Sequence, residues 1–188
     1  NCSKPYQFID LFAGIGGFRL ALEALGCNCA FSSEWDKFCQ KTYLSNFHEI
    51  PYGDITNIPA TEIPDHDILV GGFPCQPFSI AGVTKNNSLN LKHGFEHITQ
   101  GNLFFHIVRI LQKKQPSAFI LENVKNLLSH NKKKTFSIIN NTLSQELGYQ
   151  IYYKVVDASY IVPQKRQRVF IVGFKPARKF NFPDFINL

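Results

Sequence analysis

Short apolar runs alternate along the chain with segments in which apolar residues recur at helical spacing. The runs predict β-strands, the first of which continues into a glycine turn, at residues 8–14, 29–33, 67–73, 117–124, 149–158 and 168–174. The intervening segments predict helices at residues 18–26, 37–47, 102–114 and 134–148. Gly26 and Gly148 close the first and last of these helices, and Asn102 is the predicted N-cap of the third.

Strands alternate with helices and the sequence contains no repeat, which predicts one α/β domain over residues 1–188. We expect a doubly wound, mostly parallel sheet. Ligands of such sheets bind outside the carboxyl ends of the strands, so the residues at those ends are the candidates for chemistry. A polar stretch from Val83 to Gly101 is longer than an ordinary connection, which is typical of a functional or mobile loop.

Charge is distributed unevenly along this chain of net charge +6. Residues 1–94 contain six Lys or Arg and nine Asp or Glu, whereas residues 95–188 contain fourteen and five. The balance is therefore −3 in the first half and +9 in the second. A basic half favours a polyanionic partner such as nucleic acid, and a solvated lysine-rich face is the alternative.

Hydropathy and cysteine content argue against several classes of protein. No apolar run reaches the ~20 residues of a membrane helix and no signal peptide is recognisable, so we expect a cytoplasmic protein that binds no membrane. The five cysteines form no C-x-x-C pair, which argues against a disulfide framework and a cysteine zinc site. His93 and His97 have no flanking ligand cluster, so no metal is expected.

The turn AGIGGF joins the first predicted strand to the first predicted helix. Gly14 and Gly16 fit the first two positions of the dinucleotide-binding fingerprint, but Arg19 occupies the third. Glycines at this place allow close approach of a ligand to the backbone. The substitution of the third glycine disfavours the alternative of a nicotinamide-dependent oxidoreductase.

Polar and aromatic residues follow the next predicted strands. Glu34 ends the second strand, where a carboxylate can accept hydrogen bonds from ribose hydroxyls. Trp35 offers a face on which a base can stack, and Asp54 can accept a hydrogen bond from an exocyclic amine. The three residues together predict an adenosine site, although each alone is more often structural.

Cys75 lies between Pro74 and Pro77, just beyond the third apolar run. The prolines restrict the backbone on both sides, so the thiol is carried on a stiff segment beside the predicted adenosine site. A nucleophile requires such placement, because small displacements are costly in rate. A thiol is mostly protonated at neutral pH, and Cys75 therefore needs a positive environment.

Two further candidates follow later strands. Glu122 ends an apolar strand, where an isolated carboxylate is unusual, and we expect it to act as an acid. Arg166 and Arg168 lie two residues apart before the last strand. This spacing predicts that both point to one side, where they can hold a phosphate or a substrate.

Seven motifs in this order resemble those of the C5-cytosine DNA methyltransferases of bacterial restriction–modification systems. The resemblance extends from Phe8 to Phe174 and rests on FIDLFAGIGGF, EWD, GDI, GFPCQPFSIAG, GNLFF, ENV and VPQKRQRVFIVGF. It implies a Rossmann-like fold that binds S-adenosylmethionine. The residues that would hold or line the cofactor are Phe12, Gly14, Gly16, Glu34, Trp35, Asp54, Ile55, Pro74 and Leu103.

The resemblance also implies a catalytic mechanism on double-stranded DNA. Cys75 would attack C6 of a cytosine flipped out of the duplex, and Glu122 would hold the N3 edge of the base. Arg166 would contact the carbonyl oxygen of the cytosine, and Arg168 would support the site. Two residues would lie near the DNA backbone and the flipped nucleotide: Gln76 and Ser79.

The chain departs from the family in three respects. Gln100 replaces a family arginine, and the loop before it is longer than in typical bacterial members. The sequence ends at Leu188, before the target-recognition domain and the last two family motifs. We therefore expect a recognition segment, in the same chain or as a separate subunit, to be needed for activity. The alternatives are a non-catalytic remnant that binds cofactor or DNA and a tRNA cytosine-5 methyltransferase.

Overall fold

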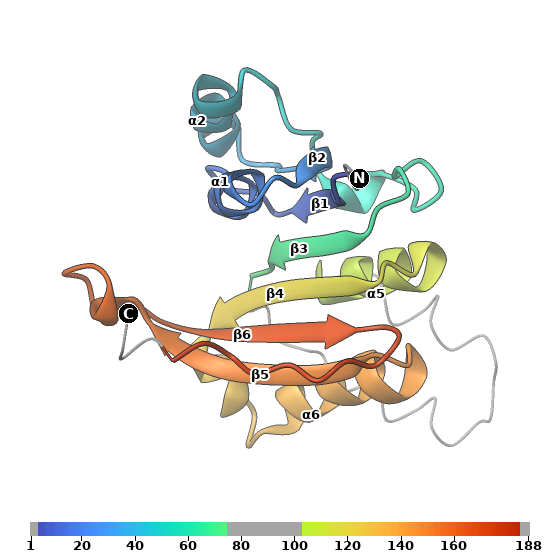
Figure 1. The fold of residues 1–188 in the computed structure, drawn as a ribbon, viewed down its shortest axis with the longest axis vertical. Helices are drawn as coiled ribbons and strands as arrows, with labels where there is room; N and C mark the ends of the chain where they lie inside the picture. The colour runs from blue at the N-terminus through green and yellow to red at the C-terminus, as the bar shows by residue number, and fades with distance from the viewer. Residues whose placement is uncertain (1–3, 75–102, 185–188) are drawn as a thin grey trace.

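The computed structural model describes residues 4–74 and 103–184. A six-stranded sheet in the order β2-β1-β3-β4-β6-β5 forms its centre (Figure 1). The strands are β1 (Gln7–Leu11), β2 (Asn28–Ser33), β3 (Ile68–Gly72), β4 (Ala118–Val124), β5 (Gln150–Asp157) and β6 (Gln167–Phe174). The first four strands are parallel, and β6 runs antiparallel to both of its neighbours. The predicted mostly parallel sheet is confirmed.

Helices cover both faces of this sheet. The described helices are α1 (Gly17–Ala24), α2 (Lys37–Phe47), α5 (Leu103–Lys114) and α6 (Lys134–Asn141). Successive residues of β1 point to opposite faces: Ile9 belongs to the large apolar cluster beneath α5 and α6, whereas Phe8 packs with Leu22 of α1. The α1 and α2 helices are joined by a hydrogen bond of 3.1 Å from Arg19 Nη1 to Tyr43 Oη. The doubly wound arrangement is therefore confirmed.

The last helix differs from the prediction of one helix over residues 134–148. The α-helix ends at Asn141, and a single π-helical turn, η3 (Thr142–Glu146), follows. The Ser144 hydroxyl donates to the carbonyl oxygen of Asn140 at 2.7 Å and so competes with the helical hydrogen bonds at this point. The amide of Leu147 bonds to Thr142 five residues back, which widens the last turn before Gly148.

Some predictions fall outside the described residues, namely the stretch from Val83 to Gly101 and the N-cap Asn102. The predicted strand that continues into a glycine turn is confirmed, since β1 ends at Leu11 and Phe12, with a φ of 57°, begins the turn. Within residues 4–74 and 103–184, no helix has both the length and the apolarity to cross a membrane.

Gly173 tests the packing of β6 against β4. It pairs with Phe119 across the two strands, and a Cβ atom at this position would overlap the Phe119 ring. We expect Gly173→Ala to lower the free energy of unfolding by about 1–3 kcal/mol, as overpacking of a core does. Urea unfolding measures this loss.

Gly53→Ala is the matched control, because a Cβ atom there would meet no described atom within 4 Å. Its free energy of unfolding should remain near that of the unsubstituted chain. Equal losses in the two variants would contradict the packing argument.

Candidate active site

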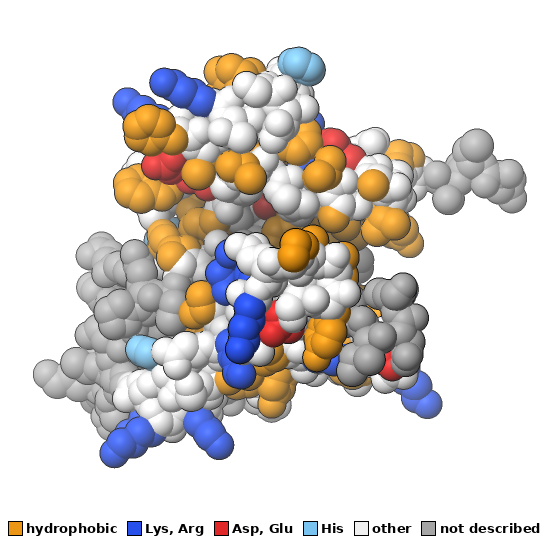
Figure 2. Space-filling view, turned by 90° about the vertical axis from the view of Figure 1, so that its left-hand side faces the viewer, with side chains coloured by type: hydrophobic (Ala, Val, Ile, Leu, Met, Phe, Trp, Pro, Cys, Tyr) orange, Lys and Arg blue, Asp and Glu red, His pale blue; other side chains and the backbone are white. Residues whose placement is uncertain are grey.

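The turns after β1 and β2 enclose a cleft at the carboxyl edge of the sheet. Figure 1 shows this edge on the left, and Figure 2 shows that side of the molecule with several Lys and Arg side chains at its centre and lower edge. The cleft is lined by Phe12, Ser33, Glu34, Trp35, Gly53, Asp54, Ile55 and Leu103. Six of the nine residues predicted from the resemblance to hold a cofactor are therefore brought together: Phe12, Glu34, Trp35, Asp54, Ile55 and Leu103.

Glu34 connects the first two turns. The Gly14 amide donates to one of its carboxylate oxygens and the Asp36 amide donates to the other, each at 2.8 Å. Each carboxylate oxygen can accept a further hydrogen bond. The side chain thus fixes the floor of the cleft and retains acceptor capacity for a ligand.

The glycine turn itself is shaped by packing between α1 and α2. Gly16 is the N-cap of α1 with a φ of 93°, and a Cβ atom there would overlap the Phe47 ring. Arg19, in the place of the third fingerprint glycine, is buried and bonds to Glu23 and Glu49 at 2.8 and 2.9 Å. This arginine holds the helices together and does not open a pyrophosphate site.

Asp54, the second carboxylate of the cleft, is the N-cap of a short 3-10 helix (Ile55–Asn57). Its Oδ1 accepts from the Thr56 amide at 2.9 Å. Trp35 is 73% exposed, so one face of the indole is accessible from the cleft. Pro74, another predicted cofactor residue, is exposed beyond the end of β3 and does not line the described cleft.

A second set of polar side chains lies on the neighbouring strands β4 and β6. Arg168 Nε and Glu122 Oε1 form an ion pair of 2.8 Å that is about three-quarters buried. Glu122 pairs with Gly72 of β3, and a Cβ atom at Gly72 would lie 3.2 Å from Glu122 Oε2. The missing side chain at Gly72 therefore makes room for the carboxylate.

Arg166 is not a member of this ion pair. It lies one residue before β6 and is exposed, and its amide donates to Asp157 Oδ1 at 3.3 Å. Arg168 lies within β6, and the expectation that Arg166 and Arg168 share one side stays a prediction. Cys75, Gln76, Ser79 and Gln100 lie outside the described residues.

Asn123 was not singled out from the sequence, although the ENV motif contains it. It is buried, and its Nδ2 donates at 2.9 Å to the carbonyl oxygen of Phe73, two residues before Cys75. The amide in the middle of an apolar strand was the available signal, since a buried amide requires a partner. Asn123 is a positioning residue for the chain that leads to Cys75.

Asp10 was also missed. It is fully buried on β1, and neither carboxylate oxygen has a hydrogen-bond partner of normal geometry among residues 4–74 and 103–184. Burial raises the pKa of the Asp10 carboxyl to about 7, and the amide and charge of Arg19 offset only part of this shift. A charged residue inside the FIDLF run was the signal in the sequence.

Comparison with known proteins relates the whole chain to one family. The family model of C-5 cytosine-specific DNA methylase matches residues 6–187. Type II methyltransferase M.NgoBI of Neisseria gonorrhoeae is 53% identical over 183 residues, which are 97% of this chain and 55% of that protein. Type II methyltransferase M.HhaI of Haemophilus parahaemolyticus is 48% identical over 181 residues, 94% of this chain and 52% of that protein. The chain thus spans about half the length of these relatives.

Solved structures of methyltransferases have the same fold. A putative DNA modification methyltransferase encoded within an Escherichia coli prophage superposes with a TM-score of 0.66 at 25% identity, covering 90% of this chain and 46% of that one. The Dnmt2 methyltransferase of S. pombe superposes with a TM-score of 0.65 at 16% identity, covering 90% and 49%. The second likeness concerns the fold alone.

Asp10 makes the stability of the fold depend on pH. Between pH 4 and 7 the unfolded chain loses the Asp10 proton while the folded chain retains it, so stability falls as pH rises. At roughly 1.4 kcal/mol per pKa unit, the contribution is on the order of 4 kcal/mol. Asp10→Asn should remove this decline, so that the variant gains stability relative to the parent chain at pH 7–8 but not at pH 4, as measured by urea unfolding.

Asp65→Asn is the control, because a hydrogen bond from Lys114 lowers the pKa of the exposed Asp65 carboxyl. Its effect should be small and of opposite sign, since a carboxylate of lowered pKa stabilises the fold above its ordinary pKa. If the stability of Asp10→Asn depends on pH as that of the parent chain does, Asp10 is not the group responsible for the decline.

Proposed function

The chain belongs to the C-5 cytosine-specific DNA methylase family, and we propose that it forms the cofactor-binding and catalytic region of a DNA (cytosine-5)-methyltransferase. The observation that carries the proposal is the strand order. The cleft lies at β1 and β2, the Glu122–Arg168 pair lies on β4 and β6, and β3, which leads to Cys75, lies between them. A nucleophile carried beyond β3 would stand between a methyl donor and the groups that hold a base.

The cleft has the chemistry that S-adenosylmethionine requires. The carboxylates of Glu34 and Asp54 supply acceptors for ribose hydroxyls and an exocyclic amine, and both retain free lone pairs after their contacts to backbone amides. Trp35 supplies a stacking face, and three side chains supply apolar walls: Phe12, Ile55 and Leu103. The cofactor would supply an electrophilic methyl group on a sulfonium.

The reaction itself would be carried by the residues around β3 and β4. The Cys75 thiolate would form a bond to C6 of a flipped cytosine while Glu122 gives a proton to N3, which makes C5 nucleophilic. After C5 is methylated, transfer of the C5 proton to water would allow the C6–sulfur bond to break and restore the thiolate, and N3 would return its proton to Glu122. Arg168 would hold the Glu122 carboxyl in place, and Arg166 would contact the carbonyl oxygen of the base.

DNA sequence recognition would depend on a further segment. Base readout needs contacts in the grooves, and the chain spans about half of its relatives. We propose that the recognition segment corresponds to the part of those relatives that this chain does not match. It would be supplied by the same polypeptide or by a partner subunit.

The adenosine assignment is tested by calorimetry with S-adenosylmethionine and its demethylated product. Because stacking of a base on an aromatic ring contributes ~1–3 kcal/mol, Trp35→Ala should weaken binding about tenfold or more. Phe38→Ala is the matched control, since Phe38 is 78% exposed and does not line the cleft. Binding of NAD in preference to these ligands would refute the proposal.

The nucleophile is tested with a DNA duplex that contains 5-fluorocytosine opposite a mismatched base, because a mismatched base is the least costly to flip. Fluorine at C5 blocks the final proton loss, so the Cys75 adduct should persist as a shifted band on a denaturing gel. Cys75→Ser should abolish the band and Cys39→Ser should not. A band that survives Cys75→Ser would identify a different thiol.

A further inference from the structure

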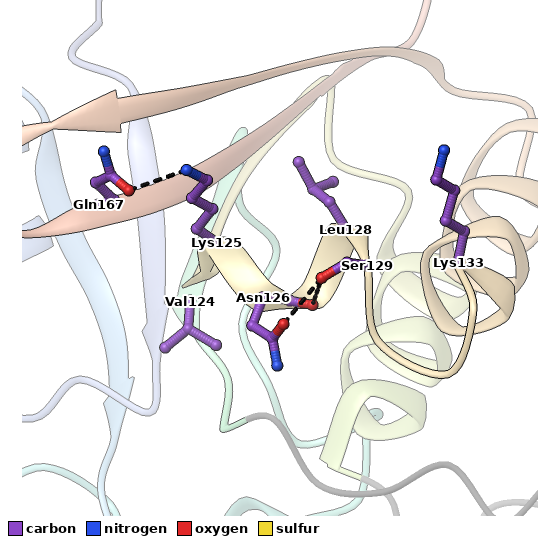
Figure 3. A pocket seen from close by; sticks show the side chains of 7 residues that line it. All are labelled: Val124, Lys125, Asn126, Leu128, Ser129, Lys133 and Gln167. Carbon is purple, nitrogen blue, oxygen red and sulfur yellow. Dashed lines mark hydrogen bonds between the residues drawn. The ribbon is translucent and has the colours of Figure 1, made fainter.

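A second cleft opens at the carboxyl end of β4, next to the Glu122–Arg168 pair. It is lined by Val124, Lys125, Asn126, Leu128, Ser129, Lys133 and Gln167 (Figure 3). Lys125 and Lys133 rise on either side of Leu128 with their ammonium groups turned to the same side (Figure 3). None of these residues belongs to the cofactor cleft.

Positive charge predominates around this cleft, where the one carboxylate in contact with the lining is Asp157, which accepts from Gln167 Nε2 at 2.9 Å within the described residues. Residues 125–134 contain four lysines and no acidic residue. Lys132, Lys133 and Lys134 are exposed, and none of them forms an ion pair within the described part of the chain. A concave surface with uncompensated positive charge attracts anions.

The acceptors of the cleft are already occupied by its own donors. Lys125 Nζ donates to Gln167 Oε1 at 3.1 Å, and Ser129 Oγ donates to Asn126 Oδ1 at 2.9 Å (Figure 3). Lys125 keeps two of its three donors, and Lys133 keeps all three among the described residues. The free ammonium donors therefore favour a ligand rich in hydrogen-bond acceptors.

Lys132 and Lys133 belong to a turn of fixed shape. Asn131, Lys132 and Lys133 have successive φ values of 49°, 53° and 69°, a left-handed conformation that is unfavourable for residues other than glycine. The turn is held by His130, whose Nδ1 lies 2.7 Å from the Thr135 hydroxyl, and by Leu127, which is fully buried. Such strain persists only where the surrounding structure enforces it.

The cleft continues directly from the ion pair. Val124 pairs with Arg168 across β4 and β6, and Gln167 precedes Arg168 in the chain. Glu122 and Lys125 lie three residue steps apart along extended chain, which is about 10 Å. That length corresponds to a rise of about three nucleotides along the duplex axis, at 3.4 Å each.

We propose that this cleft binds a backbone phosphate of the DNA strand that carries the target cytosine, clasped between Lys125 and Lys133. The inference rests on the proposed function, because it takes Glu122 as the residue that holds the base. A phosphate at this place would fix the strand a few nucleotides from the flipped base. Phosphate contacts position a protein on DNA without reading its sequence. This cleft would therefore bind the strand whatever the target sequence.

The test measures binding of a mixed-sequence duplex to the 188-residue chain over a range of salt concentrations. Each phosphate contact contributes about 0.9 to the slope of log affinity against log salt. The double variant Lys125→Gln and Lys133→Gln should bind more weakly, with a slope about one unit shallower. The charge-retaining pair Lys125→Arg and Lys133→Arg should keep the original slope.

A second double variant, Lys37→Gln and Lys41→Gln, removes the same net charge from α2 and should keep the original slope. An unchanged slope in the Lys125 and Lys133 glutamine pair would overturn the proposal, and so would an equal loss in the α2 pair. A loss confined to a structured RNA such as a tRNA would assign the cleft to RNA and overturn it as well. The chain could show the predicted weakening of DNA binding and yet fail to bind S-adenosylmethionine and to form the Cys75 adduct. That result would support the phosphate site and refute only the enzymatic proposal.

Discussion

Two adjacent glycines at the carboxyl end of β3 determine how closely the two halves of the site approach each other. A Cβ atom at Gly71 would lie 3.0 Å from the carbonyl oxygen of Leu11 on β1, and one at Gly72 would lie 3.2 Å from Glu122 Oε2 on β4. Side chains at these positions would push on the strand of the cofactor cleft and on the carboxylate. The site therefore depends on a strand end that lacks side chains on both of its faces.

A buried side-chain amide also holds the same strand end. Asn123 reaches from β4 to the carbonyl oxygen of Phe73, immediately after the two glycines. Glycine offers the greatest backbone freedom in the unfolded chain, and a buried hydrogen bond restores order at that point. The glycines provide space and Asn123 provides a fixed direction for the chain toward Cys75, so neither is sufficient without the other.

Much of this arrangement could be predicted from local patterns. Apolar runs identified all six strands, and the residues after them identified Glu34, Trp35 and Asp54 of the cofactor cleft, because parallel strands bring their carboxyl ends to one edge. The family resemblance supplied Phe12, Ile55 and Leu103. Features that depend on distant partners could not be predicted. The π-helical turn after Asn141 depends on a hydroxyl that bonds to the backbone. The raised pKa of Asp10 depends on burial that only the packed helices produce.

The two halves of the chain, which differ in net charge, contribute different strands to the sheet. Residues 1–94, with six basic and nine acidic residues and a balance of −3, contain β1, β2 and β3. Residues 95–188, with fourteen basic and five acidic residues and a balance of +9, contain β4, β5 and β6. The boundary between them is the β3–β4 pair, where Gly72 meets Glu122. In the proposed reaction the acidic side would hold a sulfonium cofactor and the basic side would face polyanionic DNA. Methyl transfer removes the sulfonium charge, so the attraction of the acidic half for the spent cofactor would fall while that of the basic half for DNA would not.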